Sequence, residues 1–175
     1  MSVPLFEKVA FIGLGLIGSS LARVMIAEGL TQNIVASTRS EKTLQDAKAL
    51  GLIQQGYSDP VQAVQGADLV VLALPVRATQ KVLETIKPYL QEHTIITDVG
   101  STKGNVVDAA KAVYGEALPA GFVPGHPIAG AEHTGVYAGK VDLFANHKVI
   151  LTPLPTSADW AVEKLIQLLS LIHIS

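Results

Sequence analysis

The sequence contains no cysteine, few aromatic residues and little net charge. Without cysteine, the 175-residue chain can form no disulfide, thiolate zinc site, iron–sulfur cluster or cysteine nucleophile. Aromatic residues make up 5% of the chain and its formal net charge is −2, so it offers neither a stacking surface nor a basic field for nucleic acid. We therefore expect an intracellular protein with no nucleic-acid partner.

Long apolar runs and a secretion signal are also missing. The longest apolar stretch, residues 69–76, is far shorter than a membrane span, and residues 1–8 lack a basic segment followed by an apolar one. We expect a soluble, cytoplasmic protein with no membrane partner. Hydrophobic residues make up 49% of the chain and charged residues 16%, so we also expect part of its surface to contact a partner domain or subunit.

Short apolar runs rich in β-branched residues alternate with segments of helical periodicity. The expected strands are residues 8–12, 33–37, 68–74, 94–97, 121–123 and 147–151. The expected helices are residues 16–28, 41–50, 78–89, 103–114 and 157–170. The run at 69–74 is apolar at every position, as in strands that helices cover on both faces. The pattern predicts an α/β fold with a doubly wound, mostly parallel sheet.

The last residues are unusual for the end of a chain. Residues 165–175 stay largely apolar to the end, where a helix cap and polar residues are usual. We interpret residues 171–175 as a truncation end or a non-native tail. The alternative is a terminal strand at the edge of the sheet.

A glycine-rich turn joins the first expected strand to the first expected helix. It consists of Gly13, Leu14, Gly15, Leu16, Ile17 and Gly18. In dinucleotide-binding turns of this spacing, the first glycine permits the tight turn, the second lets a pyrophosphate approach, and the third lets strand and helix pack closely. The alternative is an ordinary glycine-rich turn, but position, spacing and flanking strand all favour cofactor binding. We predict a Rossmann-type dinucleotide-binding domain over residues 1–170.

The end of the second expected strand indicates which cofactor is bound. An NAD site usually has an acidic residue here, about 20 positions after the glycine turn, and this chain has none. Hydroxyl and guanidinium groups stand in its place, on Ser37, Thr38, Arg39 and Ser40. The sequence favours NADP over NAD, with Arg39 on the ribose 2′-phosphate. In the alternative, Arg39 is a solvated loop residue and both cofactors are accepted.

Two further loops follow expected strands at the carboxyl edge of the sheet, where doubly wound folds bind ligands. Their expected cofactor contacts are Leu74, Pro75, Val76, Val99 and Gly100. Ser101 and Thr102 come next, and either residue would serve as a helix N-cap or as a ligand contact.

His126 is the candidate catalytic residue. It is expected at a strand end on the carboxyl edge, between Gly125 and Pro127, and the proline restricts it to an extended backbone. A neutral imidazole can take a proton from a substrate hydroxyl near pH 7 while a hydride leaves the same carbon. The other histidines fit structural or solvated positions, and no zinc-ligand spacing surrounds His126. We therefore expect no metal site.

Several motifs together resemble the prephenate/arogenate (cyclohexadienyl) dehydrogenases. They are the glycine turn continued to Ala22, the loop from Asp98 to Lys103 and the segment from Gly125 to Glu132, followed by Leu143-Phe144 and Leu151-Thr152-Pro153. Many dinucleotide enzymes share the glycine turn, whereas the serine loop followed by the histidine–proline segment is far more specific. The resemblance covers nearly the whole chain.

The resemblance implies an oxidative decarboxylation in tyrosine biosynthesis. A hydride passes from C4 of prephenate or arogenate to the nicotinamide, CO2 leaves, and the ring becomes aromatic. By the family pattern, His126 would accept the hydrogen bond or proton of the C4 hydroxyl. Ser101 would contact that hydroxyl and help to seat the nicotinamide, and Glu132 would join the polar network at the pocket mouth. The resemblance thus favours the ligand-contact role for Ser101.

The chain departs from the family pattern at its end. Family members continue into a helical domain that builds the homodimer and supplies substrate-binding groups, and that domain is absent from this sequence. We interpret the chain as the nucleotide domain of a longer enzyme, which binds NADP but turns over prephenate poorly or not at all. Two alternatives stay open: a related NADP-dependent hydroxyacid dehydrogenase or imine reductase, and a non-catalytic dinucleotide-binding module.

Overall fold

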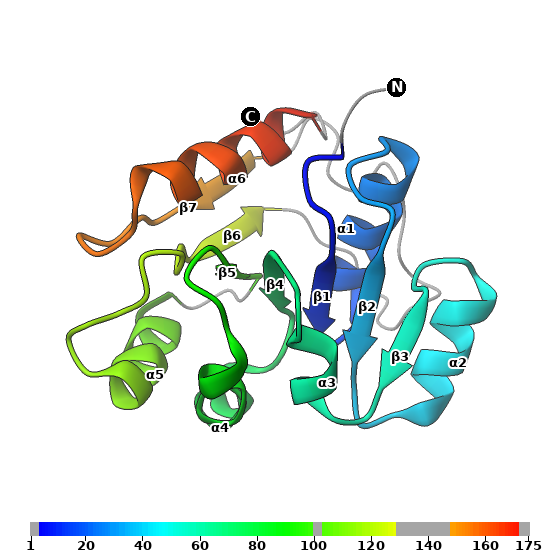
Figure 1. Cartoon of the computed structure of the whole chain (residues 1–175), viewed down its shortest axis with the longest axis horizontal. Helices are drawn as coiled ribbons and strands as arrows, with labels where there is room; N and C mark the ends of the chain where they lie inside the picture. The colour runs from blue at the N-terminus through cyan, green and yellow to red at the C-terminus, as the bar shows by residue number, and fades with distance from the viewer. Residues whose placement is uncertain (1–3, 100–102, 129–147, 172–175) are drawn as a thin grey trace.

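The computed structural model describes residues 4–99, 103–128 and 148–171, which form a sheet with helices on both faces (Figure 1). The strands are β1 (Val9–Ile12), β2 (Ile34–Ser37), β3 (Gln55–Tyr57), β4 (Leu69–Leu72), β5 (Ile95–Asp98), β6 (Gly125–Ile128) and β7 (Lys148–Leu151). The helices are α1 (Leu16–Ala27), α2 (Glu41–Ala49), α3 (Pro60–Val64), α4 (Val76–Ile86), α5 (Lys103–Tyr114) and α6 (Asp159–Leu171), with a 3-10 turn η1 at Lys87–Tyr89.

Five strands form one parallel sheet in the order β3-β2-β1-β4-β5. At its centre, Ile12 of β1 lies opposite Ser37 of β2 and Leu72 of β4, so these strands end at the same level. The chain crosses from one side of β1 to the other between β3 and β4, which places the topological switch point beside β1. This topology confirms the predicted doubly wound α/β class and the Rossmann-type fold.

Alternate residues of β1 face opposite layers of the core. Val9 and Phe11 belong to the cluster formed with α1, α2 and α6. Ala10 and Ile12 belong to the cluster formed with α3, α4 and α5. Figure 1 shows α1 and α6 on one side of the sheet and α3, α4 and α5 on the other. The continuous apolar strands of the sequence are therefore buried on both faces, as predicted.

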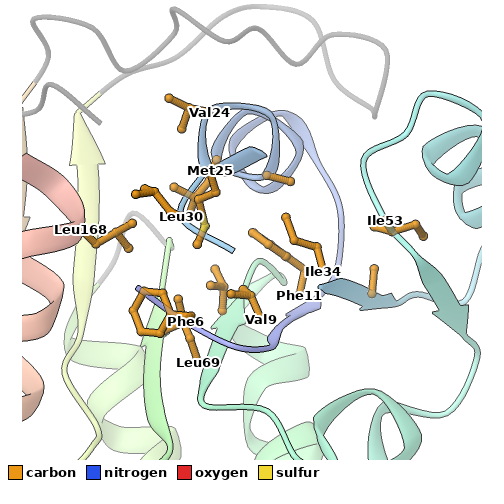
Figure 2. Close-up of a cluster of buried hydrophobic side chains, with 14 of the residues drawn as sticks. Phe6, Val9, Phe11, Val24, Met25, Leu30, Ile34, Ile53, Leu69 and Leu168 are labelled. Carbon is orange, nitrogen blue, oxygen red and sulfur yellow. The ribbon is translucent and has the colours of Figure 1, made fainter. Parts of the chain in front are cut away.

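Helical spacing of apolar residues explains how α1 and α6 pack on the sheet. Both helices bury side chains three or four positions apart, namely Leu21 and Met25 in α1, and Leu165 and Leu168 in α6. In Figure 2, Met25 of α1 and Leu168 of α6 enter the same cluster of buried side chains from different elements. Burial of each such side chain contributes about 1.5–3 kcal/mol to stability.

The segment before His126 differs from the expected pattern. The sequence predicts a strand over residues 121–123, but the segment makes only an isolated parallel bridge, between Phe122 and Ile96 of β5. The Pro124 carbonyl accepts the Thr152 N–H at 2.9 Å, and the regular strand β6 begins at Gly125 and pairs antiparallel with β7. The predicted strand is therefore wrong, and His126 lies within β6 and not at a strand end.

Two short elements are missing from the sequence-based prediction. Strand β3 has three residues and no apolar run, and helix α3 has five residues. The start of α3 does carry a signal, because Asp59 caps it by accepting the Val61 N–H at 2.9 Å and Pro60 occupies its first turn. The sequence also predicts that Val76 lies in a loop. This prediction is wrong, because Val76 is the first residue of α4.

The end of the described chain is helical. Residues 165–171 lie in α6, so the alternative of a terminal strand is wrong for them. Residues 172–175, which include most of the expected tail, lie outside the described residues. Within the parts of the chain that the structure describes, no helix is long and apolar enough to cross a membrane.

Candidate functional site

The candidate site lies along the carboxyl edge of the parallel sheet, where loops follow β1, β2, β4 and β5. Backbone hydrogen bonds tie these loops to the neighbouring strands. They run from Gly13 N–H to Ser37 C=O at 2.8 Å, from Ala73 N–H to Ile12 C=O at 2.9 Å and from Val99 N–H to Leu72 C=O at 3.1 Å. The loops are therefore held level beside the switch point, which is where doubly wound folds bind ligands.

The glycine turn presents bare backbone at this edge. Gly13 has φ of +93°, and a Cβ there would overlap the Ala73 carbonyl oxygen. A Cβ at Gly18 would lie 3.2 Å from the Ala73 Cβ, whereas a Cβ at Gly15 would meet no described atom within 4 Å. Gly15 is the N-cap of α1 and has no side chain to occupy the first N–H groups of that helix. Gly13 and Gly18 thus permit close packing, whereas Gly15 leaves open space at the N-terminus of α1, the end of a helix that favours anions.

The other residues of the turn lie in the hydrophobic core or at the start of α1. Leu14 is buried in the core cluster of α1. Leu16 and Ile17 are the first residues of α1, at the helix end that faces the opening. Their predicted cofactor contacts stay a prediction.

The four residues predicted to select NADP follow one another from β2 into α2. Ser37 is buried, Thr38 is half-buried, and Arg39 is exposed. Ser40 is exposed and caps α2, because its Oγ accepts the Thr43 N–H at 3.1 Å. The exposed fraction therefore increases from Ser37 at the end of β2 to Arg39. Ser40 has a structural role as the N-cap of α2.

A pocket of about 490 Å³ opens beside Arg39, between α2 and β3. It is lined by Thr38, Arg39, Glu41, Leu44, Gln45, Lys48, Gln55, Gly56 and Ser58. The lining includes two cationic side chains and one carboxylate. The pocket shares Thr38 and Arg39 with the predicted cofactor residues but contains no residue of the glycine turn. The pocket therefore lies next to the switch-point site, toward the outer edge of the sheet, and the two are distinct.

The loops after β4 and β5 contain the other predicted cofactor contacts. Leu74 is half-buried and its Cδ2 would lie 3.1 Å from a Cβ at Gly13, and Pro75 is exposed. Val76 begins α4, and Val99 is half-buried against the core cluster of α1. The structure thus brings Leu74 beside the glycine turn. Gly100, Ser101, Thr102 and Glu132 lie outside the described residues.

The backbone of His126 lies in β6, opposite Ile150 of β7, and its side chain lies outside the described part of the structure. One residue earlier, the N–H of Gly125 donates to Oδ1 of Asp98 at 3.2 Å. Asp98 is the last residue of β5 and is 3% exposed. Sequence reasoning gave Asp98 no role, although a carboxylate that ends an otherwise uncharged, buried strand is a recognisable signal.

Two ionisable side chains away from this edge have a pKa that burial shifts. Burial lowers the pKa of Lys8, whose Nζ donates to the Gln65 carbonyl at 2.6 Å, and burial raises the pKa of Tyr114. Both residues lie outside the candidate site. Among the described residues, no group of three or more histidine, aspartate or glutamate side chains is arranged to hold a metal ion.

The sequence matches the family described as "Prephenate dehydrogenase, nucleotide-binding domain" over residues 21–174. The chain belongs to this family. The cyclohexadienyl dehydrogenase of Zymomonas mobilis is 41% identical over 152 residues, which are 86% of this chain and 50% of that protein. The prephenate dehydrogenase of Bacillus subtilis is 39% identical over 164 residues, 93% of this chain and 44% of that protein. This member of the prephenate dehydrogenase family thus spans about half the length of these curated relatives.

A solved structure supports the same assignment. The prephenate dehydrogenase of Aquifex aeolicus, in complex with hydroxyphenyl propionate and NAD+, superposes with a TM-score of 0.87 at 27% identity. The match covers 100% of this chain and 59% of that one. The chain is therefore a nucleotide-binding domain of the prephenate dehydrogenase family, as its motifs predict.

Proposed function

We propose that the chain is the cofactor-binding part of a dehydrogenase that oxidatively decarboxylates prephenate or arogenate. The opening at Gly15 carries the proposal, because it leaves room for a pyrophosphate at the switch point of a member of this family. When bound, the nicotinamide cofactor accepts a hydride from C4 of the substrate. The C4 hydroxyl gives up its proton, CO2 leaves, and the substrate ring becomes aromatic.

Arg39 supports a preference for NADP over NAD. Its guanidinium is exposed where β2 meets α2, beside the hydroxyls of Thr38 and Ser40. An arginine binds a phosphate through charge-assisted, often bidentate hydrogen bonds, which the free ribose hydroxyl of NAD cannot provide. NAD would still bind through the glycine turn, although less tightly.

His126 and Ser101 are the proposed catalytic residues. The imidazole of His126 would accept the proton of the C4 hydroxyl, and Ser101 would hold that hydroxyl and help to seat the nicotinamide. The position of β6 supports this assignment, because the Gly125 N–H donates a hydrogen bond to Asp98, which ends β5 at the carboxyl edge. The proximity of these groups to the cofactor would supply the orientation that a hydride transfer requires.

The chain spans about half the length of its curated relatives, so part of the proposed activity belongs to the remaining half. We propose that the groups which bind the substrate's carboxylates, and the contacts of a homodimer, come from that half. The isolated chain would then bind cofactor but turn over prephenate poorly.

Fluorescence titration with NADPH and NADH tests the cofactor assignment. We expect NADPH to bind at least tenfold more tightly, a difference of about 1.4 kcal/mol, and Arg39→Ala to remove this preference. Lys42→Ala is the matched control, because it removes an exposed cation of α2 that pairs with Asp46 at 2.8 Å. Equal affinities in the unmodified chain would contradict the NADP preference, and no binding of either cofactor would contradict the cofactor-binding role.

The catalytic assignment needs a protein that turns over. The test protein is the chain joined to the part of the Zymomonas mobilis relative that it does not match, and the turnover of this fusion with His126 unchanged is the reference. We expect His126→Asn to leave NADPH affinity unchanged and to lower turnover by about 10²–10⁴-fold, as for loss of a general base. His93→Asn is the control, because His93 is exposed in the loop before β5. Full turnover in His126→Asn would overturn the catalytic role.

A further inference from the structure

Asp98 stands out as a buried acidic side chain at the carboxyl edge of the sheet. It is 3% exposed and lies opposite Leu72 in the register of β4 and β5. Burial of a carboxylate is costly unless hydrogen bonds satisfy its oxygens. Its Oδ1 accepts the buried N–H of Gly125 at 3.2 Å. The side chain therefore joins the end of β5 to the first residue of β6.

This bond lies where the backbone pairing of the segment with β5 ends. Up to Val123 the segment pairs with β5 through its backbone, with the Ile96 N–H bound to the Gly121 carbonyl at 2.8 Å and the Val123 N–H bound to the Ile96 carbonyl at 2.9 Å. The Pro124 carbonyl accepts the Thr152 N–H at 2.9 Å, which ties the next residue to the end of β7. The Gly125 N–H is the next one on the side of the segment that faces β5, and it binds the Asp98 side chain where the chain turns toward β7.

The packing around Gly125 leaves little room for a side chain. A Cβ at Gly125 would lie 3.2 Å from both the Thr97 Oγ1 and the Leu151 Cδ2. The glycine is therefore enclosed between β5 and β7, and the carboxylate of Asp98 fixes it along the edge. His126 follows immediately in the same strand. In Figure 1, β6 lies beside β5.

We propose that Asp98 is a positioning residue that clamps the start of β6 and thereby sets the backbone of His126 against the carboxyl edge. The proposal rests on the proposed function, in which His126 accepts the substrate's proton. A hydrogen bond to a carboxylate is roughly twice as strong as one between neutral groups. Because a displacement of about 1 Å lowers a rate by about 100-fold, a firm clamp beside His126 affects the reaction directly.

Amide hydrogen exchange of Gly125 in the 175-residue chain tests the clamp. We expect Asp98→Ala to raise the exchange rate of this amide at least tenfold, measured against the Val71 amide in the centre of β4. Asp98→Asn keeps an oxygen acceptor and should stay within about threefold of the unmodified chain, in line with a neutral acceptor replacing a charged one. An unchanged Gly125 exchange rate in Asp98→Ala would overturn the clamp.

Asp68 provides a matched control at the opposite edge of the sheet. Its two carboxylate oxygens accept the Lys8 N–H at 2.8 Å and the Glu7 N–H at 2.9 Å. Asp68→Ala should leave Gly125 exchange unchanged. A scalar coupling across the hydrogen bond, from the Gly125 nitrogen to the Asp98 carboxyl carbon in the unmodified protein, tests the same contact if Asp98→Ala does not fold. Absence of that coupling would overturn the clamp.

The backbone amide signal of His126 tests positioning as distinct from stability. We compare its chemical shift on adding NADP+ and on adding 2′-phospho-ADP-ribose, which lacks the nicotinamide. We expect a shift that only NADP+ produces, and its loss in Asp98→Ala with the affinity for 2′-phospho-ADP-ribose kept within twofold. The same shift in Asp98→Ala would overturn the positioning role. If the unmodified chain shows no such shift, the proposed function fails, whereas Gly125 exchange still decides the clamp.

Discussion

Gly13 and Ala73 fit together without room for a side chain, because a Cβ at Gly13 would overlap the Ala73 carbonyl oxygen and lie 3.0 Å from its carbonyl carbon. Gly13 also has φ of +93°, which side chains other than glycine rarely adopt. Gly15 is different, because its φ is −104° and a Cβ there would meet no described atom within 4 Å. The fold requires the first glycine, whereas the proposed pyrophosphate site requires the second.

Gly13→Ala should therefore destabilise the protein. We expect the free energy of unfolding to fall by about 2–4 kcal/mol, from left-handed backbone strain and the overlap with Ala73. Urea unfolding measures the change. An unfolding midpoint like that of the unmodified chain would contradict this account of the turn.

Gly15→Ala should lower the affinity for the cofactor while changing the stability of the protein little. We expect the free energy of unfolding to fall by at most about 1 kcal/mol, because the new methyl group contacts open space and the only loss is the weaker N-cap that alanine provides for α1. NADPH affinity should fall at least tenfold, because the methyl group occupies the approach of the pyrophosphate. Fluorescence titration and urea unfolding on the same preparation measure both quantities. Full NADPH affinity in this variant would contradict the placement of the cofactor.

Ser40 combines a helix cap with a predicted phosphate contact, and substitutions can separate the two. Ser40→Ala removes the oxygen that accepts the Thr43 N–H at 3.1 Å, so we expect a loss of about 1 kcal/mol in stability. Ser40→Asp keeps a cap of similar strength but places a carboxylate next to Arg39, where the 2′-phosphate would bind. We expect NADPH affinity to fall at least tenfold and NADH affinity to stay within twofold. Equal losses for both cofactors would contradict the predicted position of the 2′-phosphate.

The parallel sheet was predictable because its strands carry strong local signals. The run from Leu69 to Leu72 is apolar at every position, and glycine ends both α1 and α2. The β3 strand carries no such signal, because Gln55, Gly56 and Tyr57 form neither an apolar run nor an alternating one. Local patterns thus predict long buried elements, whereas tertiary pairing alone defines the shortest ones.

The candidate site was predictable in part, for a related reason. The glycine turn and the residues after β2 follow from spacing along the sequence, since each loop comes directly after an apolar strand. The contact of Asp98 with Gly125 joins residues 27 positions apart, so no local pattern reveals it. It depends on tertiary pairing, because residues 121–123 make only a bridge to β5 before the chain enters β6.

Tyr114 offers a prediction about stability away from the site. Its hydroxyl is buried with no hydrogen-bond partner among the described residues, and the Lys87 Nζ lies 5.0 Å from the centre of its ring. Tyr114→Phe removes the unpaired hydroxyl and keeps the ring beneath the ammonium group. We expect the free energy of unfolding to rise by about 1 kcal/mol in urea unfolding at neutral pH. A loss of stability in this variant would show that the hydroxyl has a partner after all.

The same residue should affect stability in alkali. Burial raises the pKa of Tyr114 above its ordinary value of 10.0, so the folded protein holds this proton more tightly than the unfolded chain. The contribution of the protonated Tyr114 to stability is complete below the pKa that this residue has in the unfolded chain. It is lost as the pH rises through the pKa that the residue has in the folded protein. Tyr114→Phe should therefore lose less stability than the unmodified chain when urea unfolding is repeated above about pH 10. Tyr89→Phe, at a residue 47% exposed, is the control and should follow the unmodified chain. Equal alkaline losses in all three proteins would assign the loss to other groups, because only the first variant removes the buried phenol.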